Sequence, residues 1–127
     1  MRVLIDTSVW IDYFKSGANS NRLDDLLDDN LVVINNVILA ELVPFLAIKK
    51  QFKVIALLNN ITLLSLKADW AEIIRWQTLS LSNGHNGVGI PDLLIAQNSK
   101  QQNCKIYSLD KHFHLLNKVI EDIQLFT

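Results

Sequence analysis

The sequence predicts an α/β fold in which helices cover both faces of a mainly parallel sheet. Strand-like and helix-like segments alternate along the chain, which is the order that parallel strands with helical connections require. The strand-like runs are apolar throughout, as expected for strands that are buried on both faces. A length of 127 residues fits one domain, and we expect residues 1–127 to form a single domain without linkers or internal repeats.

The chain opens with a strand and a helix. Residues 2–5 are a short, mostly apolar run that contains β-branched side chains, which indicates a first strand. Thr7 or Ser8 then offers an N-cap for a helix over residues 9–14.

The next segments predict a helix, a strand, a longer helix and another strand. The leucines of residues 19–29 have helical spacing, with acidic residues on the opposite face. Residues 31–34 form a buried strand, and residues 37–59 have the composition of a helix. Pro44 breaks or bends that helix, because proline lacks the N–H that helical hydrogen bonding needs. Residues 61–66 are a third candidate strand.

A helix over residues 68–81 and a glycine-rich loop follow. The helix has an apolar side that includes Trp70 and Trp76, and we expect both rings to lie in the core. Residues 82–89 contain three glycines and two Asn-Gly pairs, which are typical of a loop.

The last segments complete the alternation. Pro91 opens a helix over residues 92–102, since proline is favoured at the first helical position. Residues 105–109 predict a fourth strand. A short helix at 111–117 and a strand-like stretch at 123–126 end the series.

Composition and charge exclude several classes of protein. Half of the residues are hydrophobic, with only four Gly and two Pro, which excludes a disordered or collagen-like chain. Cys104 is the only cysteine, which excludes a disulfide scaffold and a zinc finger. The net charge of −1 argues against a protein that coats nucleic acid nonspecifically. No apolar run has the length of a membrane span or signal peptide, so we expect a cytoplasmic protein with no membrane association.

Four acidic residues stand at the ends of expected elements. Asp6 follows the first strand, and Asp110 follows the strand at 105–109. Asp92 lies in the first turn of its helix, and Glu41 lies about one turn into the helix after the second strand. Ligands in α/β folds gather outside the carboxyl ends of the strands, so we expect these side chains to converge there.

A divalent metal ion would compensate the negative charge of this cluster. Partly buried like charges are unfavourable unless a cation offsets them, and Lys111 is the only basic residue adjacent to any of the four acids. Oxygen ligands of this kind suit Mg²⁺ or Mn²⁺. One or two such ions activate water and polarise a phosphodiester oxygen, which indicates hydrolysis of a nucleic-acid backbone or another phosphate ester.

Structural roles compete with this interpretation at individual positions. Asp6 can cap a helix, and Asp92 can favour a helix N-terminus through the helix dipole. Asp12 either supports the Asp6 segment or lies on the surface. His112 and His114 form a His-x-His pair, for which we expect a surface or phosphate-contact role rather than zinc ligation.

These motifs resemble those of a known family. Residues 3–14 (VLIDTSVWIDYF) resemble the start of PIN-domain proteins, most of all the VapC-type ribonuclease toxins of toxin–antitoxin pairs. Residues 39–42 (LAEL), 90–96 (IPDLLIA) and 108–113 (SLDKHF) match the later motifs of the family in the same order. Together these segments span nearly the whole chain.

The resemblance implies a three-layer α/β/α sandwich and a Mg²⁺- or Mn²⁺-dependent endoribonuclease. It places four residues at the acidic positions of the family: Asp6, Glu41, Asp92 and Asp110. Three hydroxyls would contact these acids or metal-bound water: those of Thr7, Ser8 and Ser108. Ile38 departs from the pattern, because a Thr or Ser is common there and would support Glu41. Family members usually form homodimers and are neutralised by a cognate VapB-like antitoxin.

The resulting hypothesis is an RNA-cleaving toxin. Three acids hold the metal, directly or through water, and Glu41 is a further ligand or orients the attacking water. Basic residues that flank the acids predict RNA contacts: Lys49, Lys50, Lys53, Lys111 and His112.

Two other functions remain open at this point. One is a catalytically silent PIN-like module that binds RNA or protein. The other is an aspartate-based phosphatase, since Asp6 ends the first strand, although that chemistry usually needs an Asp where Ser8 stands.

Overall fold

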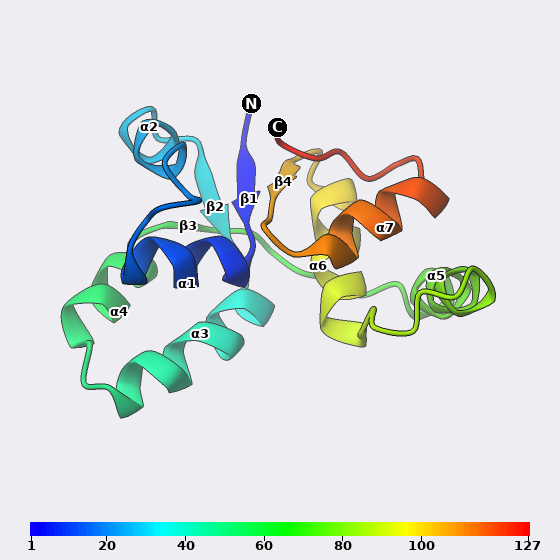
Figure 1. The fold of residues 1–127 in the computed structure, drawn as a ribbon, viewed down its shortest axis with the longest axis horizontal. Coiled ribbons are helices and arrows are strands. Elements are labelled where there is room, and N and C mark those ends of the chain that lie inside the picture. The colour runs from blue at the N-terminus through cyan, green and yellow to red at the C-terminus, as the bar shows by residue number, and fades with distance from the viewer.

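Four parallel strands form the central sheet, in the order β3-β2-β1-β4 (Figure 1). The computed structural model describes residues 1–127. The strands are β1 (Val3–Ile5), β2 (Val32–Ile34), β3 (Thr62–Leu63) and β4 (Lys105–Tyr107). All pairings are parallel, and β1 lies between β2 and β4. The predicted α/β class with a parallel sheet is therefore confirmed.

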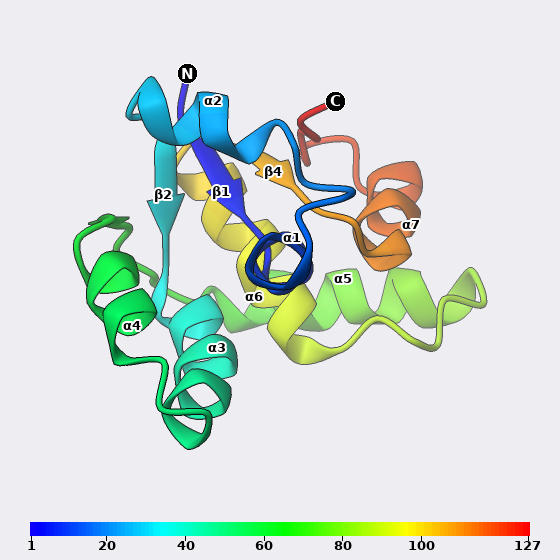
Figure 2. The ribbon, with the colours of Figure 1, turned by 60° about the vertical axis from the view of Figure 1, so that its left-hand side comes forward.

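Seven helices cover the two faces of this sheet. They are α1 (Thr7–Lys15), α2 (Leu23–Asp28), α3 (Asn36–Ile48), α4 (Phe52–Asn59), α5 (Trp70–Ser82), α6 (Ile90–Gln101) and α7 (Lys111–Val119). The chain runs outward from β1 to β3 and then crosses back to β4 on the other side of β1. Right-handed crossovers in opposite directions place their helices on opposite faces. In Figure 2, α1 lies in front of the sheet and α6 behind it, which gives the three layers expected.

The core lies on both sides of β1. A cluster of 28 buried apolar residues fills the space between the sheet and the two helical layers. All three residues of β1 are completely buried, because this strand has neighbours on both edges and helices on both faces. Cys104 is buried, as expected for a small apolar side chain. A bilayer-spanning helix is absent, since every helix falls short of the length and hydropathy that crossing needs.

The first helix begins earlier than the sequence predicts. Asp6 is its N-cap, not Thr7 or Ser8, and the Asp6 side chain accepts a hydrogen bond from the backbone N–H of Ser8 at 3.3 Å. The extended backbone of Asp6 continues the strand, so its side chain is free to turn back onto the next helix. One residue thus ends β1 and starts α1.

The predicted helix over residues 37–59 is wrong as a single element. It is two helices, α3 and α4, separated by a turn in which Lys50 has a left-handed backbone (φ +58°). Pro44 neither ends nor divides the helix but lies inside α3. The burial of Leu42 and Leu46 on the inner face of α3 outweighs the hydrogen bond that proline removes.

Helix α5 exposes one of the two tryptophans that were expected in the core. Trp76 is only 3 % exposed, but Trp70 is 58 % exposed and Ile74 is 66 % exposed. At 100° per residue, Trp70, Ile74 and Leu81 fall on one face of the helix, about 110° around the axis from the buried face that contains Trp76. The prediction for Trp70 is wrong because the helix buries only the face that contacts α6 and α7.

The C-terminal stretch does not form a fifth strand. Residues 123–126 make one isolated parallel bridge, between Leu125 and Ile106 of β4. Backbone hydrogen bonds from Ile106 to Gln124 and from Phe126 to Ile106 attach this segment to the edge of the sheet. The apolar residues of this segment thus cover β4 as a short, irregular extension of the sheet.

A buried pair of asparagines connects α3 to α6 at the carboxyl ends of the strands. Asn35, the N-cap of α3, accepts a hydrogen bond from the Ile38 N–H and donates to Asn98 of α6 at 2.9 Å. Asn98 in turn donates to the carbonyl of Ser65 at 2.9 Å. Both asparagines are essentially inaccessible to solvent, so these bonds hold the two helices in a defined relation.

Replacing Asn98 with Leu should destabilise the protein by about 1–3 kcal/mol, because it leaves buried partners without hydrogen bonds. Urea denaturation followed by circular dichroism measures the change. Gln101→Ala removes an exposed hydrogen bond from the same helix and serves as the control, with an expected change within about 0.5 kcal/mol. Equal stability of Asn98→Leu and the unaltered protein would contradict the role of this pair.

Candidate metal centre at the carboxyl ends of β1 and β4

The strand order changes direction between β1 and β4, and an acid follows each of these two strands. Ligand sites in parallel sheets form at such switch points, outside the carboxyl ends of the strands. Asp6 directly follows β1 and donates its backbone N–H to the carbonyl of Tyr107 in β4 at 2.9 Å. Asp110 follows β4 by three residues. Figure 1 shows the first turns of α1, α3, α6 and α7 near this end of β1.

Two serine hydroxyls hold the carboxylate of Asp6. Ser8 Oγ donates to Asp6 Oδ2 at 2.8 Å, and Ser108 Oγ donates to the same oxygen at 2.9 Å. The two hydroxyls accept hydrogen bonds from the backbone N–H groups of Leu109 and Asp110, which fixes the direction of their own protons. Asp6 is only 5 % exposed. Its second oxygen, Oδ1, makes no hydrogen bond with the protein and is left for another partner.

Asp110 and Asp92 sit at the beginnings of helices. Asp110 is the N-cap of α7 and accepts a hydrogen bond from the His112 N–H at 2.9 Å. Asp92 lies in the first turn of α6 and accepts one from the Gly89 N–H at 3.1 Å. Backbone N–H groups and the positive end of the helix dipole favour a carboxylate at these places. The structural roles weighed from the sequence therefore coexist with membership in the cluster.

Glu41 is supported from a neighbouring helix. The Thr7 hydroxyl of α1 donates to Glu41 Oε1 at 3.0 Å. Ile38, which lacks the polar side chain that would support Glu41, is completely buried in the core. Thr7 thus supplies the hydrogen bond that position 38 does not, and the structure brings Glu41 to the other acids.

Burial and mutual repulsion act on the free carboxylates. Burial raises the pKa of Asp92, while the Gly89 N–H and His112 oppose the rise, and the charges of Asp110 and Asp6 add to it. Burial likewise raises the pKa of Glu41; Thr7 opposes this, and the charges of Asp6, Asp92 and Asp110 reinforce it. Each acid therefore feels the others, and a cation among them would relieve both effects.

His112, for which the sequence predicts a surface or phosphate-contact role, lies directly against two of the acids. Its Nδ1 lies 3.4 Å from Asp92 Oδ2 and 3.3 Å from Asp110 Oδ1, whereas His114 is exposed. Donor atoms of Asp92, Asp110 and His112 all lie within 4.8 Å of one another. This donor set, with two carboxylates and an imidazole beside the free oxygen of Asp6, fits a small divalent cation. The sequence signal that could have placed His112 beside the acids is its position two residues after Asp110, the acid that caps α7.

The lysines predicted to contact RNA are divided between two places. Lys49, Lys50 and Lys53 lie around the turn between α3 and α4. Lys49 is eight residues from Glu41 along α3, or roughly 12 Å at 1.5 Å per residue. Lys111, in contrast, is exposed at the start of α7, next to Asp110. The structure brings only Lys111 and His112 to the acids, and the RNA contacts stay a prediction.

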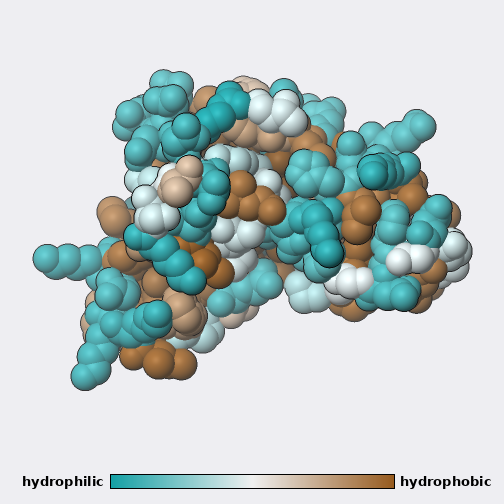
Figure 3. Space-filling view, in the orientation of Figure 1, coloured by the Kyte–Doolittle hydropathy of each residue, from teal (hydrophilic) through white to brown (hydrophobic).

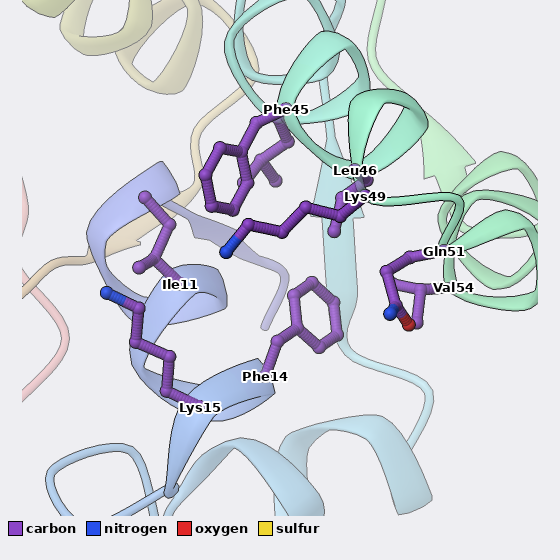
Figure 4. A pocket seen from close by; sticks show the side chains of 9 residues that line it. Ile11, Phe14, Lys15, Phe45, Leu46, Lys49, Gln51 and Val54 are labelled. Atoms are coloured by element: carbon purple, nitrogen blue, oxygen red, sulfur yellow. The ribbon is translucent and has the colours of Figure 1, made fainter.

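An apolar groove lies between α1, α3 and α4. It has a volume of about 260 Å³, and most of its lining side chains are hydrophobic, including Phe14, Leu42 and Phe45. In Figure 4 the Lys49 side chain runs between the rings of Phe14 and Phe45, and Lys15 stands at the same side. The Lys49 ammonium lies 4.4 Å from the centre of the Phe45 ring. The groove is therefore apolar inside and positively charged at its rim.

Comparison with known families accounts for this arrangement. The family model described as the PIN domain matches residues 3–119 of the chain. The chain belongs to the PIN domain family. No curated protein matches the chain at a significant level.

Solved structures share the fold of this PIN domain at low sequence identity. VapBC-1 from nontypeable Haemophilus influenzae has a TM-score of 0.74 at 21 % identity, covering 99 % of this chain and 97 % of that one. DNA-bound VapBC from Salmonella typhimurium has a TM-score of 0.74 at 17 % identity, with the same coverage. VapBC2 from Rickettsia felis, bound to a promoter DNA fragment, has a TM-score of 0.70 at 19 % identity, covering 99 % and 98 %.

Replacing Asp92 with Asn should stabilise the metal-free PIN domain by about 1 kcal/mol at pH 7. The folded-state pKa of Asp92 is raised, so the native protein loses stability as the pH rises through that pKa. The gain should thus be largest above this pKa and absent in acid, where Asp92 is protonated in both the folded and the unfolded state. Urea denaturation in EDTA at several pH values measures it.

Glu121→Gln provides the comparison, because Glu121 is an exposed acid that is not part of the cluster. Its stability should change by less than about 0.5 kcal/mol at every pH. If Asp92→Asn destabilised the metal-free protein at pH 7, the repulsion argued for this cluster would be refuted.

Proposed function

We propose that this PIN domain is a metal-dependent endoribonuclease that acts in the cytoplasm as the toxin of a toxin–antitoxin pair. The observation that carries the proposal is the hydrogen bonding of the four carboxylates. Each binds groups of the protein through one oxygen and makes no hydrogen bond through the other. Four free carboxylate oxygens at one edge of a parallel sheet suit the binding of Mg²⁺ or Mn²⁺. The fold similarity to VapBC complexes supports the same function.

The residues divide into metal-binding and orienting roles. Asp6, Asp92 and Asp110 would hold the metal, which when bound supplies a Lewis acid for the phosphodiester and lowers the pKa of water. Glu41 orients the attacking water, and Thr7 fixes the direction of its carboxylate. The raised pKa of Glu41 suits acceptance of a proton from that water better than an ordinary carboxylate would.

Lys111 offers the nearest exposed positive charge for an RNA phosphate. It stands beside Asp110 at the start of α7, so a backbone that reaches the acids passes its ammonium group. Lys49, Lys50 and Lys53 would contact more distant phosphates of a longer RNA. The aspartate-phosphatase alternative has less support, because Ser8 uses its hydroxyl to hold Asp6 and no second carboxylate stands there.

The groove between α1, α3 and α4 is the surface we propose for the antitoxin. Its apolar lining suits the hydrophobic side of a peptide segment, and the lysines at its rim suit acidic residues on that segment. The VapBC structures that share this fold are described by two-component names, which is consistent with a protein partner. Figure 3 shows hydrophobic side chains at the surface near α3 and α4.

Homodimer formation stays a prediction, and α5 offers the surface for it. Trp70, Ile74 and Leu81 form an exposed apolar stripe along this helix. Such stripes mark contacts between proteins, and two copies could cover it through a twofold axis. Sedimentation velocity decides the matter: a monomer at all concentrations would exclude the dimer.

Asp6→Asn should reduce RNA cleavage at least about a hundredfold, because it removes a negative charge from the proposed metal site. Asparagine can still accept the hydrogen bonds of Ser8 and Ser108, so the fold should survive. Cleavage of a single-stranded RNA in Mg²⁺ or Mn²⁺, measured beside circular dichroism, provides the test. Asp25→Asn, a change at an exposed acid on α2, should leave cleavage unchanged.

A normal cleavage rate for folded Asp6→Asn would contradict the assignment of the site. The absence of both metal binding and RNA cleavage in the unaltered protein would favour the silent binding module instead.

Phe45→Asp should abolish binding of the cognate antitoxin in a protein that still cleaves RNA. The change places a negative charge in the apolar groove. Phe45 lies one turn beyond Glu41 on the same side of α3, so the cleavage rate is measured alongside and should fall much less than antitoxin binding. Co-purification of the two proteins measures binding. Leu57→Asp, at a more exposed position on α4 outside the groove, is the control and should retain the antitoxin. Retained binding by Phe45→Asp would exclude this groove.

A further inference from the structure

We propose that His112 is itself a ligand of the metal, through Nδ1, and that this nitrogen makes the site prefer Mn²⁺ to Mg²⁺. The inference rests on the metal dependence proposed above, but not on the identity of the RNA or of the antitoxin. It assigns metal binding to a histidine, in addition to the four acids that the motifs identify.

The spacing of the donor atoms matches ligands of one small ion. His112 Nδ1 lies 3.3 Å from Asp110 Oδ1 and 3.4 Å from Asp92 Oδ2. Each of these two oxygens also accepts one backbone N–H and keeps a second lone pair for a metal ion, beside the free oxygen of the same carboxylate. Adjacent ligands of an octahedral ion with bonds of about 2.1 Å stand about 3.0 Å apart, so a small closure of the three side chains is enough. Both carboxylates and the imidazole belong to the same compact donor set.

The imidazole is oriented by its surroundings. The backbone N–H of His112 donates to Asp110 Oδ1, which fixes the start of its side chain. The other edge of the ring lies against the glycine-rich loop: a Cβ atom at Gly87 would stand 2.8 Å from His112 Nε2. With Nε2 directed toward the loop, Nδ1 is the nitrogen that faces the acids. Gly87 thus leaves the space that this orientation needs.

The chemistry of the donor atoms predicts that the site prefers Mn²⁺ to Mg²⁺. Imidazole nitrogen suits transition-metal ions, whereas Mg²⁺ binds oxygen ligands and keeps several waters. Replacing one oxygen donor by a nitrogen therefore favours Mn²⁺. The competing role for His112 is that of a counter-ion, in which a protonated ring offsets the charges of Asp92 and Asp110 in place of a metal.

The two roles predict opposite effects of removing the ring. A ligand contributes to binding, so His112→Ala should weaken Mn²⁺ binding at least about tenfold and Mg²⁺ binding less. A counter-ion competes with the metal, so its removal should strengthen the binding of both ions. Isothermal titration of the purified full chain with MnCl₂ or MgCl₂ measures both Kd values without any RNA. His114→Ala, on the same helix but exposed, should leave both values unchanged.

Electron spin-echo envelope modulation spectroscopy of the bound Mn²⁺ detects a nitrogen ligand directly. The unaltered protein should show coupling to a ¹⁴N nucleus, and His112→Ala should lack it. Gly87→Ala keeps the imidazole but crowds its Nε2 edge, so it should also reduce the coupling and weaken Mn²⁺ binding. This second variant keeps the test decisive if His112→Ala folds poorly.

Three results would overturn the inference: unchanged or tighter Mn²⁺ binding by His112→Ala, no ¹⁴N coupling in the unaltered protein, or no preference for Mn²⁺. If the unaltered protein bound neither ion, the metal dependence proposed above would fail together with this inference. If it bound Mn²⁺ with no contribution from His112, only this inference would fail.

Discussion

A carboxylate buried at the end of the central strand is the constraint on which the rest of the site depends. Asp6 cannot lie there without partners, because an isolated buried charge is strongly unfavourable. Ser8 supplies one hydrogen bond from α1, and Ser108 supplies another from the loop after β4. The same serine accepts the N–H of Asp110, so satisfying the first acid also positions the second. The burial of one side chain thereby joins two strands and two helices at one edge.

The protein offsets only part of the repulsion that this arrangement creates. Asp6, Asp92 and Asp110 each accept a backbone N–H at the N-terminus of a helix, where the helix dipole also favours negative charge. Burial nevertheless raises the pKa of Asp92 and Glu41. Carboxylates that are held in place but incompletely compensated are typical of functional sites, where stability is given up for binding or catalysis.

The parts of this structure that local sequence determines were predictable, and those that depend on packing were not. Apolar runs that end in acids identify two of the strands, and because the sheet is parallel these acids are expected at the same edge, as Asp6 and Asp110 are. The family resemblance implied that the Thr7 hydroxyl contacts the acids or metal-bound water, but not which acid it reaches. That partner, Glu41, and the approach of His112 to the acids depend on how separate helices pack, which no spacing in the sequence records. The exposure of Trp70 has the same origin, because its helix contacts neighbours on only one face.

Anomalous diffraction from crystals soaked in Mn²⁺ tests the central claim most directly, because it locates the ion independently of any activity. The account predicts a peak at the carboxyl ends of β1 and β4, within bonding distance of Asp92 and Asp110 and directly or through water in contact with Asp6. A saturating soak that leaves this edge of the sheet without a peak, or that places the ion at another part of the molecule, would contradict it.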